Sequence, residues 1–170
     1  MERYQDIHEI IKDFLWLGNF KAAINIEDLK NKGIKKILSL WEISGFEYDS
    51  DEFIHKTIAI NDNYDQNIIQ YFGECINFIK GNDKVFVHCM AGASRSASIV
   101  IAYIMWSQKK SFSEAYNYVK SIRSIFPNSG FQHQLKNFEE LLVKNDYKID
   151  NINFKDLKWE VDSEPKYIYL

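Results

Sequence analysis

The sequence predicts an α/β fold with a central, mostly parallel sheet flanked by helices. Short apolar runs of strand length alternate with longer segments whose apolar residues recur at helical spacing. The run at residues 84–87 is apolar after its first residue, as expected for a strand covered on both faces. The 170 residues, of which 46% are hydrophobic, suffice for one sizeable core.

The first half of the chain is predicted to contain three strands and one helix before its first long helical segment. A Gly-Asn pair ends the first strand, and Asn25 is a suitable N-cap for a helix that stops at Gly33. The expected elements are a strand over 9–17, a helix over 25–33, strands over 36–41 and 53–60, and a polar turn over 44–51.

The second half alternates helices with one buried strand. Apolar residues at helical spacing predict a helix over 68–79, and Ser111 with Glu114 forms a capping-box pattern that opens another helix. The remaining expected elements are the strand over 84–87, an apolar helix over 97–106 and a last amphipathic helix over 131–142.

Composition narrows the class of protein. We expect one domain over residues 1–145 and a tail over 146–170 that is partly ordered or disordered. A net charge of −3 disfavours nucleic acid and anionic membranes as general partners, and no apolar stretch is long enough for membrane insertion. We see no leader or lipidation motif, and the presence of only two cysteines argues against a disulfide scaffold and fits a reducing compartment. We therefore expect the chain in the cytoplasm, and the nucleus is a second expected location.

The loop at residues 88–96 carries the most chemical information. Its sequence, His-Cys-Met-Ala-Gly-Ala-Ser-Arg-Ser, lies between the buried strand and the apolar helix. Backbone N–H groups in such a turn converge on one point, and the helix dipole favours an anion there. Gly92 permits a tight turn, while Arg95 can grip two phosphate oxygens with its planar fork. The positive charge of the helix dipole, the N–H groups and Arg95 also favours the thiolate form of Cys89. This thiolate would lie under a bound phosphorus and act as a nucleophile.

Two simpler explanations of the loop compete with this one. Cys89 could be a buried structural cysteine beside an arginine that pairs elsewhere, since free cysteine is often buried. His88 beside Cys89 could also suggest a metal site, but Cys75, His55 and His133 do not stand at ligand spacing. We therefore expect no metal and no cofactor.

The pattern His-Cys-x-x-Gly-x-x-Arg-Ser resembles the signature of the cysteine-dependent protein tyrosine phosphatase superfamily, and its Ala-Gly-x-Ser-Arg-Ser-Ala form resembles the dual-specificity branch. Other segments fall where that family places similar ones, and the resemblance covers about residues 7–143. These segments are 15–19, 33–38, 61–62 and 127–132. The resemblance implies a protein tyrosine phosphatase-like fold and a catalytic domain over residues 1–145.

The resemblance also implies roles for individual residues. Cys89 would be the nucleophile, and the phosphate would bind to Cys89, Met90, Ala91, Gly92, Ala93, Ser94 and Arg95. Asp62 follows a predicted strand where similar phosphatases carry their general acid, with Asp65 as the alternative, although an Asp at such a place is often only a turn residue. Ser96 could donate to the Cys89 sulfur or cap the helix. His88 and Asn128, with Gln132, are expected to support the loop structurally.

The uncharged loop residues favour a phosphoprotein substrate, because inositol-lipid phosphatases of this superfamily typically carry lysine there. RNA phosphatases usually follow the arginine with Thr-Gly, from which Ser96-Ala97 departs. Two alternatives remain open: a catalytically weak adaptor that binds phosphoproteins, and a phosphoinositide phosphatase. A protein kinase is a candidate substrate by family analogy alone, and the oligomeric state is not predicted.

Overall fold

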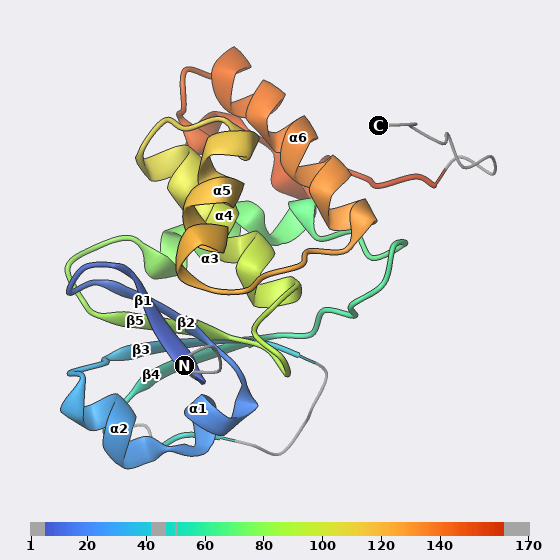
Figure 1. Ribbon diagram of the computed structural model, residues 1–170. Coiled ribbons are helices and arrows are strands. Elements are labelled where there is room, and N and C mark those ends of the chain that lie inside the picture. Colours follow the sequence, from blue (N-terminus) through green and yellow to red (C-terminus); the bar gives the residue numbers. More distant parts are fainter. Residues whose placement is uncertain (1–5, 42–46, 50, 162–170) are drawn as a thin grey trace.

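The computed structural model describes residues 6–41, 47–49 and 51–161 (Figure 1). They contain one five-stranded sheet in the order β1-β2-β5-β3-β4, in which only the β1–β2 pair is antiparallel. The strands are β1 (Ile7–Ile11), β2 (Leu15–Gly18), β3 (Lys36–Leu40), β4 (Ile54–Ile58) and β5 (Val85–His88). The carboxyl ends of the four parallel strands therefore meet at one edge, with β5 in the middle, where α/β sheets bind ligands.

Helices cover both faces of this sheet, which confirms the predicted fold class. In Figure 1, two short helices lie on one side of the sheet and four longer ones on the other. The short ones are α1 (Phe20–Ile24) and α2 (Ile26–Asn31), and the others are α3 (Phe72–Ile79), α4 (Arg95–Ser107), α5 (Phe112–Ile122) and α6 (Ser129–Lys144). Across the described ranges, none of the helices is both long and apolar enough to cross a bilayer.

The core is divided by the sheet, and β5 shows why its sequence is apolar throughout. Val85 and Val87 pack with the four longer helices, whereas Phe86 packs on the opposite side with residues of α1 and α2. Side chains alternate between the faces of a strand, so a strand with helices on both sides needs apolar residues at every position. This packing fixes the carboxyl end of β5, where the nucleophile loop begins.

Two expectations about the first half of the chain are wrong. The single strand predicted over 9–17 is a hairpin, in which Asp13 has φ 56° and donates its N–H to Glu9 Oε1 at 2.7 Å. Helix α1 was not predicted, because five residues are too few to show a helical period. Its N-cap is Asn19, whose side chain accepts from Ala22 N at 3.1 Å.

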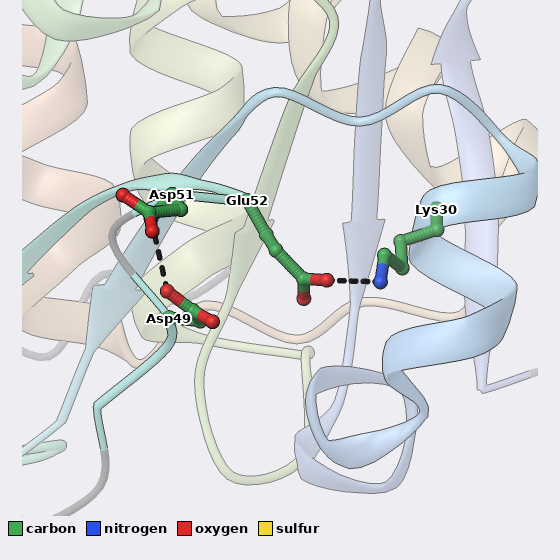
Figure 2. Close-up of polar contacts among 4 residues, drawn as sticks. All are labelled: Lys30, Asp49, Asp51 and Glu52. Carbon is green, nitrogen blue, oxygen red and sulfur yellow. Dashed lines mark hydrogen bonds and ion pairs between the residues drawn. The ribbon is translucent and has the colours of Figure 1, made fainter.

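Polar contacts on the surface tie α2 to the turn before β4 (Figure 2). Lys30 forms an ion pair with Glu52, and Asp51 N donates to Asp49 Oδ1 at 3.0 Å. Both partners of the ion pair are solvent-accessible, so we expect it to contribute little to stability. Residues 44–46 and 50 of the expected polar turn lie outside the described residues.

The chain after α6 packs back onto the domain. Its two 3₁₀ helices are η2 (Ile149–Asn151) and η3 (Phe154–Asp156), and Ile149 and Ile152 are buried. The Phe154 ring lies 6.0 Å from the Phe138 ring of α6. Residues 162–170 of the expected tail lie outside the described residues, and the proposed domain boundary at 145 stays a prediction.

Candidate active site

The nucleophile loop, residues 89–94, connects the end of β5 to the start of α4. Cys89 lies at its base with only 2% of its surface exposed. Two groups that can donate hydrogen bonds lie beside its sulfur: Ser96 Oγ at 3.0 Å and the backbone N–H of Gly92 at 3.2 Å. Because both can point their hydrogens at the sulfur, the site is suited to hold it as an anion.

The carbonyl groups of residues 90–93 all accept hydrogen bonds from donors outside the loop. These donors are Phe20 N to Met90 O (3.0 Å), Arg123 Nη2 to Ala91 O (3.1 Å), Arg123 Nε to Gly92 O (2.9 Å) and Phe126 N to Ala93 O (2.8 Å). In a planar trans peptide the C=O and the following N–H point in opposite directions. The N–H groups of residues 91–94 therefore point away from these donors, and the N–H of Gly92 contacts the Cys89 sulfur. Successive backbone N–H groups turned in this way can bind an anion.

Gly92 is the position where this loop cannot carry a side chain. Its φ is +65°, and a Cβ built there would lie 2.3 Å from the carbonyl oxygen of Gly18 at the end of β2. The glycine is needed both for the left-handed backbone and for the close approach of the two loops. The sequence predicted the tight turn at Gly92, but it did not predict the close approach of the Gly18 backbone.

Arg95 is the first residue of α4, directly after the nucleophile loop. Its Nη1 donates to Ile60 O at 3.1 Å, which holds one side of the guanidinium group. Its Nε is buried and has no partner among the described residues. Donors of this kind, next to the loop N–H groups and at the start of a helix, match the oxygens of a phosphoryl group.

Asp62 follows β4 and lies against the rim of the nucleophile loop. Its Oδ1 accepts from Ser94 Oγ at 2.7 Å and from Asn128 Nδ2 at 2.9 Å. Both bonds end on Oδ1, so the carboxyl group is fixed by one oxygen. Asp62 and Asp65 are both exposed, but in the described part of the chain only Asp62 has a hydrogen bond to the nucleophile loop. The geometry therefore favours Asp62 over Asp65 as the acid of this site.

His88 lies behind the loop in a chain of hydrogen bonds. It is fully buried, its Nε2 is 2.6 Å from Ser39 Oγ, and that oxygen is 2.9 Å from His55 Nε2. Burial lowers the pKa of His88 to about 4, so the ring is neutral at pH 7. Its Nδ1 lies 3.5 Å from Cys89 O, which suits a supporting role. No group of three or more potential metal ligands occurs among the described residues.

Asn128 contacts both sides of the site. Its backbone N–H donates to Ser94 Oγ at 3.0 Å, its Nδ2 donates to Asp62, and its Oδ1 caps α6 by accepting from Phe131 N at 3.0 Å. Gln132 instead donates to Pro127 O at 2.8 Å and so holds the preceding turn. Asn128 thus contacts Asp62 as well as the nucleophile loop, which the sequence predicted it to support.

The sequence missed Arg123, which follows α5 and is only 7% exposed. Besides the two loop carbonyls, its Nη1 lies 2.9 Å from His8 Nδ1 on β1. An arginine at the expected end of a helix has an ordinary explanation in the helix dipole, so its position alone carried no signal. Ser94 was expected only as part of the phosphate-binding loop, whereas its hydroxyl also links Asp62 to Asn128.

Known proteins share this arrangement over most of the chain. Residues 15–141 match the family model described as "Dual specificity phosphatase, catalytic domain". Human dual specificity protein phosphatase 6 is 41% identical over 138 residues, which cover 78% of this chain and 36% of that protein. Dual specificity protein phosphatase 1 of Arabidopsis thaliana is 34% identical over 149 residues, covering 85% of this chain and 75% of that protein.

A solved structure agrees with these relatives. The human tyrosine phosphatase-like serine/threonine/tyrosine-interacting protein superposes with a TM-score of 0.77 at 34% identity, covering 82% of this chain and 99% of that one. The chain spans only about a third of the length of the human phosphatase above. The resemblance inferred from the nucleophile loop is confirmed: the chain belongs to the dual specificity phosphatase catalytic-domain family.

Proposed function

We propose that this chain hydrolyses phosphotyrosine and phosphoserine or phosphothreonine in proteins through a phosphocysteine intermediate. Its membership of the family supports this activity. The single observation that carries the proposal is the environment of Cys89, whose sulfur accepts a hydrogen bond from the Gly92 N–H and lies 3.0 Å from Ser96 Oγ, in the loop that ends directly before Arg95 and the start of α4. A buried nucleophile inside an anion site is what an attack on a bound phosphoryl group requires.

In the first step, the Cys89 thiolate attacks the phosphorus while the loop N–H groups and Arg95 bind the non-bridging oxygens. A sulfur–phosphorus bond forms and the bond from phosphorus to the substrate oxygen breaks. Asp62, as the protonated acid, gives its proton to that departing oxygen, which leaves as the free hydroxyl of the protein substrate.

In the second step, the Asp62 carboxylate takes a proton from a water molecule as that water attacks the phosphorus. The sulfur–phosphorus bond breaks, inorganic phosphate is released and Cys89 is expelled as a thiolate. Ser96 Oγ, 3.0 Å from the sulfur, stabilises this thiolate by donating a hydrogen bond. His88 and Asn128 support the two reacting groups without touching the substrate.

The rim of the site favours a phosphoprotein over a phosphoinositide. Met90 is 46% exposed and Phe126 is 75% exposed, so the groups bordering the loop on these two sides are apolar. An apolar rim can contact the residues around a phosphorylated side chain, whereas extra phosphates of an inositol ring would need cationic partners. A kinase is one candidate substrate, and the need for a reduced Cys89 favours the cytoplasm or nucleus.

Hydrolysis of a small aryl phosphate in the presence of a chelator tests the proposal. The native chain should turn over between pH 5 and 8, and Cys89→Ser should abolish turnover. Ser98→Ala removes another buried hydroxyl near the start of α4 and should retain turnover. No turnover by a folded, reduced native chain would favour an adaptor that binds phosphoproteins. Equal turnover by the native chain and Cys89→Ser would exclude Cys89 as the nucleophile. Faster release of phosphate from inositol-lipid micelles than from phosphopeptides would favour a phosphoinositide phosphatase.

A further inference from the structure

Trp159, in the segment after η3, contacts the loop that carries Asp62. Its indole Nε1 donates to Tyr64 O at 2.8 Å. Its ring lies 5.7 Å from the Tyr64 ring in an edge-on arrangement and is stacked at 6.0 Å on His133 of α6. The indole therefore lies against both α6 and the acid loop, defined here as residues 61–67.

The acid loop is bound to the C-terminal segment at a second point as well. Asn67 Nδ2 donates to Leu157 O at 2.8 Å, so the segment contacts the loop both at Tyr64 and at Asn67. On the other side, Gly130 of α6 approaches so closely that a Cβ there would lie 2.3 Å from Tyr64 O. The carbonyl group two residues after Asp62 is thus enclosed between α6 and the indole.

The segment is itself fixed to the core before it reaches the acid loop. The Phe154 ring packs against the Gly73 backbone of α3, where a Cβ would lie 2.4 Å from the ring. Farther from the loop, Trp106 Nε1 donates to Tyr147 O at 3.0 Å. Because the Phe154 contact holds this part of the chain on the domain, Trp159 can transmit its position to the acid loop, whereas the Trp106 bond holds only the chain before η2. The matched family region covers residues 15–141, so Trp159 lies outside it while Tyr64 lies within it.

We propose that Trp159 is a positioning residue that holds the acid loop so that Asp62 can reach the departing oxygen; this rests on the proposed role of Asp62. A general acid must lie within hydrogen-bond distance of the oxygen that it protonates. Small displacements of such a group slow the step that uses it and leave other steps unchanged. Among the described residues, Trp159 contacts Tyr64 and His133, neither of which belongs to the nucleophile loop.

This role predicts an effect that depends on the leaving group. An oxygen that leaves readily as an anion, as in p-nitrophenyl phosphate, needs little protonation, whereas that of phenyl phosphate needs much more. A residue that merely stabilises the fold would alter the two rates by the same factor. The ratio of kcat/KM values for the two substrates therefore reports the position of the acid.

The test uses Trp159→Phe in the full chain, which keeps an aromatic ring on His133 and removes the donor to Tyr64 O. We expect kcat/KM for phenyl phosphate to fall roughly tenfold, and that for p-nitrophenyl phosphate to fall less than about twofold. Both are smaller than the loss of about 100-fold or more expected when a general acid is removed, because Trp159→Phe displaces the acid without removing it. Trp106→Phe is the matched control. It removes a similar indole hydrogen bond, to Tyr147 O between α6 and η2, and it should leave the ratio unchanged.

Two further variants separate the possible failures. If Asp62→Asn leaves the ratio unchanged, the proposed acid is wrong; if Asp62→Asn changes it and Trp159→Phe does not, the role of Trp159 is wrong. Trp159→Phe should also have no further effect on the ratio in the Asp62→Asn background. Should Trp159→Phe fail to fold, Asn67→Ala removes the other tie to the segment and should shift the ratio in the same direction, and no shift would overturn the proposal.

Discussion

The nucleophile loop and the acid loop reach the same site in different ways. The nucleophile and the residues proposed to bind phosphate lie within one short stretch, residues 88–96, between a strand and a helix that fix its ends. The acid loop, by contrast, is held by Ser94, Asn128, Gly130 and Trp159, which are distant from it in sequence. Nucleophile chemistry is thus encoded locally, whereas the position of the acid depends on tertiary contacts and can be tuned separately.

This contrast is incomplete, because distant residues also support the nucleophile loop, and Arg123 makes two of these contacts. Arg123 supplies the donors for two adjacent loop carbonyls, Ala91 O and Gly92 O. Those bonds fix the direction of peptide groups whose N–H groups we propose to bind the phosphate. The predictions below test how far the local loop depends on long-range support, beginning with the largest expected effect.

Substitution of Arg123 should have the largest effect. Arg123→Met fills similar space but removes the donors to the two loop carbonyls, and buried acceptors that lose their partners are costly. We expect the free energy of unfolding to fall by about 3 kcal/mol, measured by urea denaturation. Arg123→Lys, which restores one donor, should recover part of the loss. Unchanged stability in Arg123→Met would mean that the nucleophile loop holds its shape from local sequence alone.

The same contrast explains which features the sequence predicted. The fold class, the capping box at Ser111 and Glu114 and the loop around Cys89 depend on short-range patterns, and each was visible in one stretch of sequence. Arg123 and Trp159 have no such pattern, because their partners are backbone carbonyls of residues far along the chain. Every residue has a backbone carbonyl oxygen, so a hydrogen bond to such an oxygen produces no recognisable pattern in the sequence.

The buried His88 should make stability depend on pH. Its pKa in the folded chain is about 4, below the ordinary value of 6.5, so between these values the unfolded chain binds a proton that the folded chain excludes. Stability should therefore fall as the pH falls, by about 2 kcal/mol between pH 7 and pH 5 from this residue. Urea denaturation at both pH values should show a weaker pH dependence for His88→Gln than for the native chain.

Two other histidines with lowered pKa values, His8 and His55, also contribute to the native pH dependence. Both remain in the His88→Gln variant, so the difference between the two chains reports His88 together with its effect on His55, to which Ser39 Oγ connects it. An equal pH dependence in both chains would contradict the buried neutral ring behind the nucleophile loop.

The smallest effect should come from Ser94, the residue at which the two loops meet. By sequence it belongs to the nucleophile loop, but its hydroxyl contacts Asp62 at 2.7 Å and Asn128 N at 3.0 Å. Ser94→Ala should therefore behave as a change in the acid loop, lowering kcat/KM for phenyl phosphate about tenfold while p-nitrophenyl phosphate is nearly unaffected. Ser98→Ala, which removes a hydroxyl one turn along α4, should leave both rates unchanged. If Ser94→Ala lowered both rates equally, the hydroxyl would serve phosphate binding, and the acid could not be tuned independently of the nucleophile at this contact.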